Sequence, residues 1–130
     1  MSDDATPRLG LPYLAAGQAQ KHVTLNEALA RLDGLVQTAV ESRAVAAQPA
    51  DPADGALYIL PVDATGDAWA GRPAGTLMRF EAGAWAALTV AEGCLAWIAD
   101  EALLVPRVAD GWAPVVPEVD LQNIALLGVG

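Results

Sequence analysis

Few residues of this chain have the type and spacing that catalysis or metal binding requires. The sequence contains one histidine, His22, and one cysteine, Cys94. A zinc site takes several clustered thiolate, imidazole or carboxylate ligands, which single residues of each kind do not supply. No serine lies in a Gly-x-Ser-x-Gly pattern, so no hydrolase nucleophile is indicated. We therefore expect no catalytic residue, no metal ion and no cofactor.

Carboxylates are numerous, because the chain contains 16 Asp and Glu residues. A glycosidase needs a pair of them on either side of a sugar. The carboxylates here show no pairing beyond turn segments, where aspartate is common for conformational reasons. The sequence also lacks the aspartate pattern of a calcium loop and the Gly-Lys ending of a phosphate loop. These observations predict a protein that is not an enzyme.

Four tryptophans provide the largest aromatic surfaces. They are Trp69, Trp85, Trp97 and Trp112. An indole face can stack on a sugar ring, but in a small β domain tryptophan more often fills a core or an interface. We expect packing roles. Contact of Trp69 and Trp112 with carbohydrate is the alternative, and it would make the domain a module that binds host surface polysaccharide.

A dense polar cluster precedes and overlaps the clearest helical pattern. Its members are Gln18, Gln20, Lys21, His22, Asn26 and Glu27. The cluster could form a buried network or a contact between subunits, because amides make directional hydrogen bonds that do not depend on pH and so suit a permanent joint. A ligand pocket is the alternative use of this cluster.

An amphipathic helix is predicted over residues 25–42. Thr24 and Glu27 have the spacing of a capping box, in which each side chain accepts a hydrogen bond from the other residue's N–H. Gly34 interrupts the helical residues and costs about 1 kcal/mol relative to alanine. The residues that recur every three or four positions, as on one helical face, are Leu25, Leu29, Leu32, Val36 and Val40. We expect this face and the polar cluster to form the assembly interface.

The remaining chain has the character of β structure. Short apolar segments alternate with glycine-bearing turns, a pattern typical of antiparallel hairpins. The segments are 56–60, 76–80, 84–88, 94–98, 102–105 and 111–115. They fall into two similar sets, which an internal duplication or chance would explain. The predicted fold class is α+β, with an N-terminal amphipathic helix and a small antiparallel β-meander, for which two similar three-stranded units are one arrangement.

Composition divides the chain into four regions. Residues 1–10 form an N-terminal arm, and residues 11–47 form a helical assembly segment. A loop rich in proline and glycine opens the β domain, which we place at 48–118. Residues 119–130 finish on apolar residues without a cap, and we expect them to begin a C-terminal extension or connector.

Charge and hydropathy exclude some partners. The net charge is −9 and the basic residues are scattered, so a polyanion such as nucleic acid would be repelled. No apolar run has the roughly 18 residues of a membrane span, and no signal peptide is visible. We expect assembly in the bacterial cytoplasm without membrane insertion. The chain is 54% apolar but rich in alanine, and the resulting thin core favours self-association.

The run Gln18-Ala-Gln-Lys-His-Val-Thr24, followed by Asn26-Glu-Ala-Leu29 and Leu32-Asp33, is distinctive. It resembles the opening of an uncharacterised phage-protein domain family, found in prophages and gene transfer agents of alphaproteobacteria. The later Pro52-Ala-Asp-Gly55 and Gly83-Ala-Trp85 fit the same family, and the resemblance covers residues 9–115. Leu25 departs from the polar residue of many relatives, which leaves open what the helix packs against.

This resemblance implies a structural virion component. It suggests the N-terminal assembly or attachment domain of a tail fibre or head spike on a phage-like particle, where it would contribute to host attachment. The implied partners are further copies of the chain and other capsid, tail or baseplate proteins. A homotrimer is the expected stoichiometry, since fibres close around a cyclic axis, and a pentamer on a capsid vertex is the alternative. Head or tail location, host receptor and anchoring protein stay open.

Overall fold

A computed structural model describes residues 4–15 and 21–114, except the side chains of Lys21 and His22. These residues form one helix and seven strands. The elements are α1 (Lys21–Leu35), β1 (Thr38–Val40), β2 (Leu57–Ile59), β3 (Leu77–Glu81), β4 (Ala84–Leu88), β5 (Leu95–Ile98), β6 (Leu103–Val108) and β7 (Gly111–Trp112). Among them, no helix has both the length and the apolar character to cross a bilayer.

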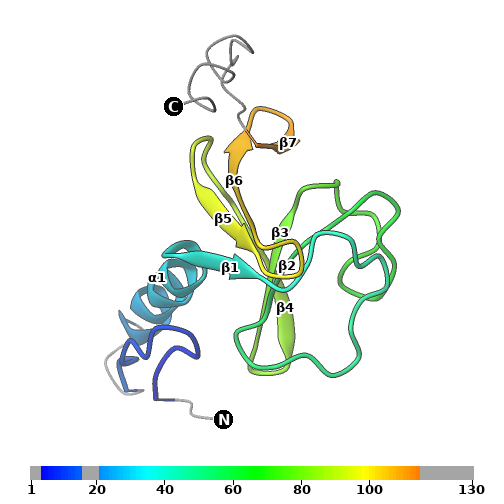
Figure 1. The fold of residues 1–130 in the computed structure, drawn as a ribbon. Coiled ribbons are helices and arrows are strands. Elements are labelled where there is room, and N and C mark those ends of the chain that lie inside the picture. Colours follow the sequence, from blue (N-terminus) through cyan, green and yellow to red (C-terminus); the bar gives the residue numbers. More distant parts are fainter. Residues whose placement is uncertain (1–3, 16–20, 115–130) are drawn as a thin grey trace, which may run out of the picture.

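The strands form two small sheets, and α1 lies to one side of them (Figure 1). One sheet is an antiparallel meander in the order β2-β3-β4. The other has the order β1-β5-β6-β7, in which β5, β6 and β7 form a second antiparallel meander. The predicted α+β class is confirmed, and each half of the β region supplies a three-stranded antiparallel unit.

The hairpin turn between β3 and β4 lies where the sequence places glycine. Ala82 and Gly83 join β3 to β4 with φ angles of 54° and 81°. Two central residues with positive φ match the right-handed twist of the flanking strands, which is why such tight turns favour glycine. The predicted segment 84–88 coincides with β4, and the predicted segment 111–115 is too long, because β7 ends at Trp112.

The predicted helix at 25–42 is wrong at both ends. The helix already includes Lys21, so Thr24 and Glu27 lie inside it and do not form a capping box at its start. It ends at Leu35, and Gln37 follows with a positive φ of 47°. The Thr38 hydroxyl then donates to the Gly34 carbonyl at 2.8 Å. This bond satisfies one of the carbonyls that a helix end leaves without a partner.

The strand β1 was not expected from the sequence. Thr38–Val40 pairs in parallel with β5, and its residues alternate between buried, exposed and buried. Val40 is therefore a core residue of a strand, although its spacing from Val36 also fits a helical stripe. A four-residue spacing fits both the helical repeat and the two-residue repeat of a strand, so the pattern alone did not distinguish a helix from a strand here.

Two apolar clusters form the core. The larger lies between the two sheets and unites Val40, Leu57, Ile59, Leu77, Ala96, Ile98, Val105 and Trp112. The smaller lies on the other face of the β2-β3-β4 sheet and contains Leu60, Ala64, Trp69 and Met78. Leu77 and Met78 are adjacent in β3 and enter different clusters, as the alternation of a strand requires.

Candidate functional site

A buried ion pair fixes α1 to the β2-β3-β4 sheet. Asp33, near the end of the helix, is fully buried, and its Oδ2 accepts from Nη2 of Arg79 in β3 at 3.0 Å. The other Nη of Arg79 donates to Glu81 Oε1 at 2.6 Å. A buried charge is tolerated when it is paired and hydrogen-bonded, and both terminal nitrogens of Arg79 meet this condition, whereas its buried Nε has no hydrogen-bond partner among the described residues.

The N-terminal arm binds the same carboxylate. The backbone N–H groups of Arg8 and Leu9 donate to Asp33 at 3.1 and 2.6 Å. The Arg8 guanidinium donates to the backbone carbonyls of Asp33, Val36 and Gln37 at the C-terminal end of α1. A cation at this end also interacts favourably with the helix dipole. The arm therefore caps the helix and locks its orientation.

The pKa values of this network follow from burial and hydrogen bonding. Burial alone would raise the pKa of Asp33, but hydrogen bonds from Thr6, Leu9, Arg79 and Arg8 outweigh it and hold this pKa below its ordinary value. Burial would likewise lower the pKa of Arg79, and its bonds to two carboxylates raise it instead. Asp33 and Arg79 are thus both charged across the ordinary pH range.

Two further contacts secure Tyr13 and Leu14, which follow the arm. The Asn26 side-chain amide both accepts from the Leu14 N–H at 2.8 Å and donates to the Leu14 carbonyl at 3.0 Å. The Tyr13 hydroxyl donates to Glu81 Oε2 at 2.6 Å, and burial together with this bond raises the pKa of Tyr13 to about 12. We therefore assign Asn26, which was expected at the assembly interface, to a clamp within the chain.

Gly34 permits the close approach of α1 to the sheet. A Cβ at this position would lie 2.4 Å from Leu88 Cδ1 and 3.2 Å from Arg79 Cδ. The first distance is far inside van der Waals contact, so a larger residue would force the Leu88 side chain or the helix to shift. The helix thus faces the sheets with Gly34, Asp33 and the partly buried Leu35, whereas Leu25 and Leu32 are exposed.

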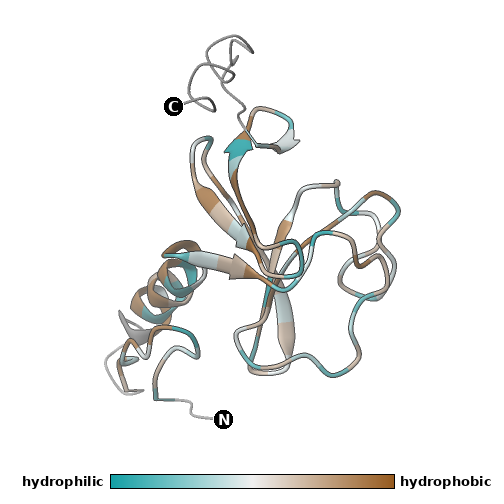
Figure 2. Cartoon of the chain, in the orientation of Figure 1, coloured by the Kyte–Doolittle hydropathy of each residue, from teal (hydrophilic) through white to brown (hydrophobic). Residues whose placement is uncertain are grey.

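As a consequence, the apolar stripe of α1 points away from the body. Leu25 is 45% exposed, Leu32 is 47% exposed and Val36 is 37% exposed. We call these three residues the helix stripe, and Figure 2 shows apolar colour along α1. An ordinary amphipathic helix turns such a stripe toward its own core. Leu29 of the predicted interface is partly buried beside it.

A second apolar surface lies on the outer face of the β5-β6 hairpin. Leu95 is 53% exposed, Trp97 is 42% exposed and Leu104 is 53% exposed. Trp97 is directly opposite Leu104 across the strands, and the exposed Ala39 is opposite Trp97 on β1. We call the three large residues the sheet face. The sequence signal was available, because β5 reads Leu-Ala-Trp-Ile without any polar position.

The structure describes the other predicted interface residues only in part. Gln18 and Gln20 lie outside the described residues. Lys21 and His22 belong to the first turn of α1, and their side chains also lie outside the description. Their roles in assembly stay predictions.

The burial of Trp69 and Trp112 does not favour the alternative in which they contact carbohydrate. Trp69 is 0% exposed and Trp112 is 9% exposed, so neither offers a ring face to a sugar. Trp69 packs against Tyr58 and Trp85, with ring centroids 5.4 and 5.2 Å away. The Trp112 indole N–H donates to the Gly75 carbonyl at 2.8 Å. Both rings fill the core, which was the expected role of tryptophan in general.

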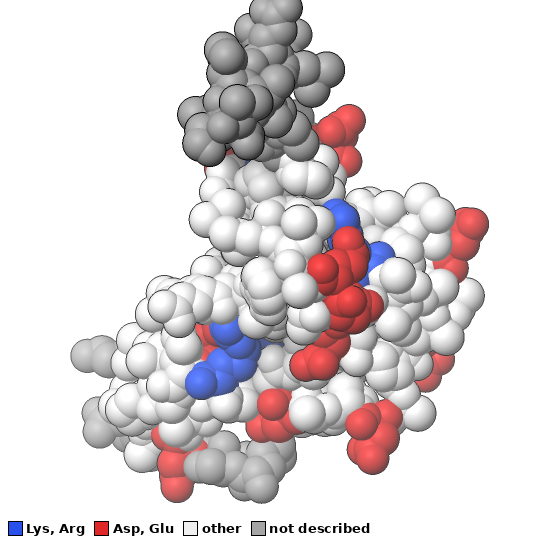
Figure 3. Space-filling model, viewed as in Figure 1, with Lys and Arg blue, Asp and Glu red and all other residues white. Residues whose placement is uncertain are grey.

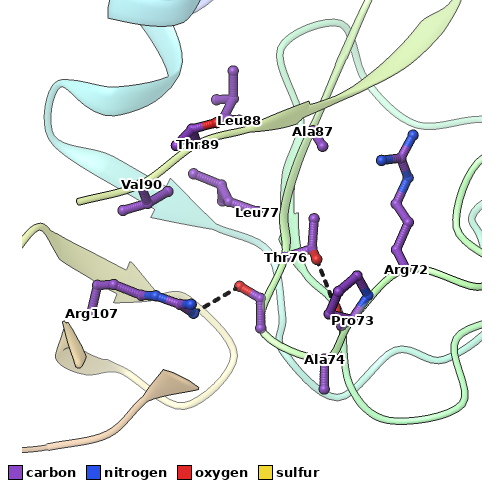
Figure 4. A pocket seen from close by; sticks show the side chains of 11 residues that line it. Arg72, Pro73, Ala74, Thr76, Leu77, Ala87, Leu88, Thr89, Val90 and Arg107 are labelled. Carbon is purple, nitrogen blue, oxygen red and sulfur yellow. Dashed lines mark hydrogen bonds between the residues drawn. The ribbon is translucent and has the colours of Figure 1, made fainter. Parts of the chain in front are cut away.

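An open pocket of about 370 Å³ lies between the loop before β3, the end of β4 and β6 (Figure 4). Leu77, Leu88 and Val90 form apolar parts of its wall, and Arg72 and Arg107 lie at opposite ends of the view. Its lining contains no carboxylate, imidazole or thiol, so it has no acid–base pair. Arg107 donates to the Gly75 carbonyl at 3.3 Å.

Charge is distributed unevenly over the surface. In the view of Figure 3, acidic groups gather beside the end of β1 and on loops, whereas α1 and the β5-β6 hairpin are mostly uncharged. Within residues 4–15 and 21–114, no group of three His, Cys, Asp or Glu residues has the geometry to hold a metal ion. The most extensive unusual features of the described surface are therefore its two apolar patches.

Comparison with protein-family models assigns the chain to a family. The model of the family described as "Protein of unknown function (DUF2793)" matches residues 25–113, which include most of α1 and all seven strands. Searches of curated proteins and of solved structures find no match. Since the matched region covers more than half of the sequence, the chain belongs to the DUF2793 family.

Proposed function

We propose that this chain is a structural component of a phage-like particle, such as a prophage particle or gene transfer agent. Its N-terminal domain assembles and attaches a tail fibre or head spike, which contributes to host attachment. Its partners are further copies of itself and other capsid, tail or baseplate proteins. Three copies around a cyclic axis are the proposed stoichiometry, and five on a capsid vertex are the alternative.

The outward helix stripe is the observation that carries the assembly role. Large apolar side chains in contact with water favour association, and contiguous patches of them commonly mark interaction surfaces. The Asp33–Arg79 pair and the Arg8 cap hold α1 in place. A preformed, rigid surface loses little conformational entropy when a partner binds.

The particle context has a separate basis. It comes from the resemblance of residues 18–33 to proteins of prophages and gene transfer agents, and the family match alone names no particle. The rival function, a carbohydrate-binding module, depended on Trp69 and Trp112, which are core residues. We therefore carry only the assembly function forward.

Genetic complementation of a particle-producing strain tests this function. The gene is deleted and restored as wild type, as Leu32→Glu or as Val62→Glu. Leu32 belongs to the helix stripe, whereas Val62 is a loop residue that is 72% exposed, so both changes place a glutamate in water. Particles are purified, the chain is quantified by mass spectrometry, and appendages are counted by electron microscopy.

We expect the wild type and Val62→Glu to restore an appendage that the deletion removes. Leu32→Glu should accumulate as folded protein in the cell and be depleted from particles. Purified particles that never contain the chain, with appendages unchanged in the deletion strain, would refute the proposed function.

A further inference from the structure

One of the two uncovered apolar surfaces lies on a helix and the other on the face of a sheet. We infer that the helix stripe of one copy packs on the sheet face of another copy. This inference rests on the proposed assembly function and names the contact that achieves it. A helix laid on a sheet is one of the few arrangements that bury both apolar surfaces of two layers.

The dimensions of the surfaces fit this arrangement. The helix stripe extends over residues 25–36, which corresponds to about 16 Å along the helix axis. The sheet face lies on β5 and β6 with β1 beside them, and neighbouring strands are about 4.8 Å apart. A single helix of about 10 Å diameter therefore covers the width of these three strands.

Neither surface can cover the other within one chain. The opposite side of α1 is fixed to β3 by Asp33 and Arg79, and Gly34 lies against Leu88. Turning the stripe toward the chain's own β5-β6 hairpin would break that buried ion pair. A partner that buries the helix stripe or the sheet face must therefore be something other than these two surfaces of the same chain.

Charge favours a second copy as the occupant. The chain has a net charge of −9, so copies repel one another wherever their carboxylates meet. β5 and residues 103–106 carry no charged side chain, and the helix stripe is entirely aliphatic. A cationic partner would instead be expected on a surface that presents carboxylates. These uncharged surfaces are where two acidic copies can approach closely.

The exposed area is of a suitable size for a self-association contact. Six large apolar side chains at 37–53% exposure present on the order of 500 Å². The two surfaces are separate, and one helix-on-sheet contact between two copies would bury both of them together with the alanines nearby. With its polar rim, the contact would approach the lower limit of a specific interface.

Mixing two defective variants distinguishes this contact from helix–helix pairing. Leu32→Glu damages the helix stripe, Leu104→Glu damages the sheet face, and Val62→Glu is the control. Mass is measured by light scattering after size exclusion of the full chain, and circular dichroism verifies folding. Leu95→Glu is a second sheet-face variant, used if Leu104→Glu does not fold.

The wild type and Val62→Glu should form oligomers, and each of the two interface variants alone should be monomeric. Their equimolar mixture should form a species of two chains, because one variant keeps its sheet face and the other its helix stripe. Trp97, on the sheet face, should become less accessible to acrylamide in this mixture.

Three results would overturn the inference. An oligomeric Leu104→Glu beside a monomeric Leu32→Glu would show that stripes pair with each other, which leaves the assembly function standing. A mixture that stays monomeric would exclude the helix-on-sheet contact. A monomeric wild type whose Trp97 is already shielded would indicate that a segment of the same chain covers the sheet face.

Discussion

Replacing Asp33 with asparagine tests whether the buried ion pair holds α1 on the sheet. The substitution keeps the size of the side chain and removes its charge. Among the described residues, the buried Arg79 would then retain Glu81 as its carboxylate partner. The two N–H groups of Arg8 and Leu9 would face an amide with a single acceptor oxygen.

The expected loss is about 3 kcal/mol of unfolding free energy. Removing one partner of a buried ion pair costs about 3–5 kcal/mol. The lower end applies because Glu81, at 2.6 Å, still compensates the Arg79 charge. For a domain of this size the loss corresponds to a decrease in Tm of roughly 10–15 °C.

The pH dependence supplies an independent signature. The folded-state pKa of Asp33 lies below its ordinary value of 3.8, so the carboxylate stabilises the fold above that pH. Its contribution is lost as pH falls from 3.8 through the lowered pKa. Urea unfolding, followed by tryptophan fluorescence, should show a smaller loss of stability on acidification in Asp33→Asn than in the wild type.

Asp51→Asn is the matched control, since Asp51 is exposed and forms no ion pair with the other described residues. Its stability should remain within about 0.5 kcal/mol of the wild type. If Asp33→Asn were equally neutral and kept the wild-type pH dependence, the ion pair would not be what anchors the helix.

Three other substitutions test the packing around the helix and in the core. Gly34→Ala should destabilise by about 1 kcal/mol in urea unfolding, because the clash with Leu88 exceeds the gain in helix propensity; a more stable variant would contradict this. Tyr13→Phe should cost about 1 kcal/mol through the lost bond to Glu81. It should also remove a tyrosine that titrates at about pH 12 in absorbance at high pH, and an unchanged titration would refute the assignment. Since the raised pKa favours the protonated phenol, this stability is present below pH 10.0 and is lost as pH rises toward 12. Trp69→Ala should cost about 3–5 kcal/mol, as expected for a core aromatic, and a loss below about 1 kcal/mol would argue against a core role.

The β elements could be predicted well because their signals are local. Apolar segments separated by turns located β2 to β6 within a few residues, and Gly83 marked the turn between β3 and β4. The helix was also recognised, but not its end. A helix and a strand share the spacing from Val36 to Val40, so only the pairing of β1 with β5 decides between them.

The candidate site required the tertiary structure. Asp33 and Arg79 are 46 residues apart, and no local pattern indicates that they meet. A hint existed, because Arg79 stands within an apolar strand and a buried cation needs a partner. Which acid would serve as that partner depends on the packing of α1 against β3.

The sequence by itself determined the order of the elements, the position of the apolar stripe and the acidic, alanine-rich composition, because each depends on neighbouring residues or on totals. Only the tertiary structure decided that the stripe faces outward, that Trp69 is buried and that Trp97 is exposed. The physical reason is that either face of a helix can pack against a sheet, and the sequence pattern alone does not determine which face does. Here the buried ion pair and the close approach at Gly34 fix which side of the helix meets the sheet, and they leave Leu25 and Leu32 exposed.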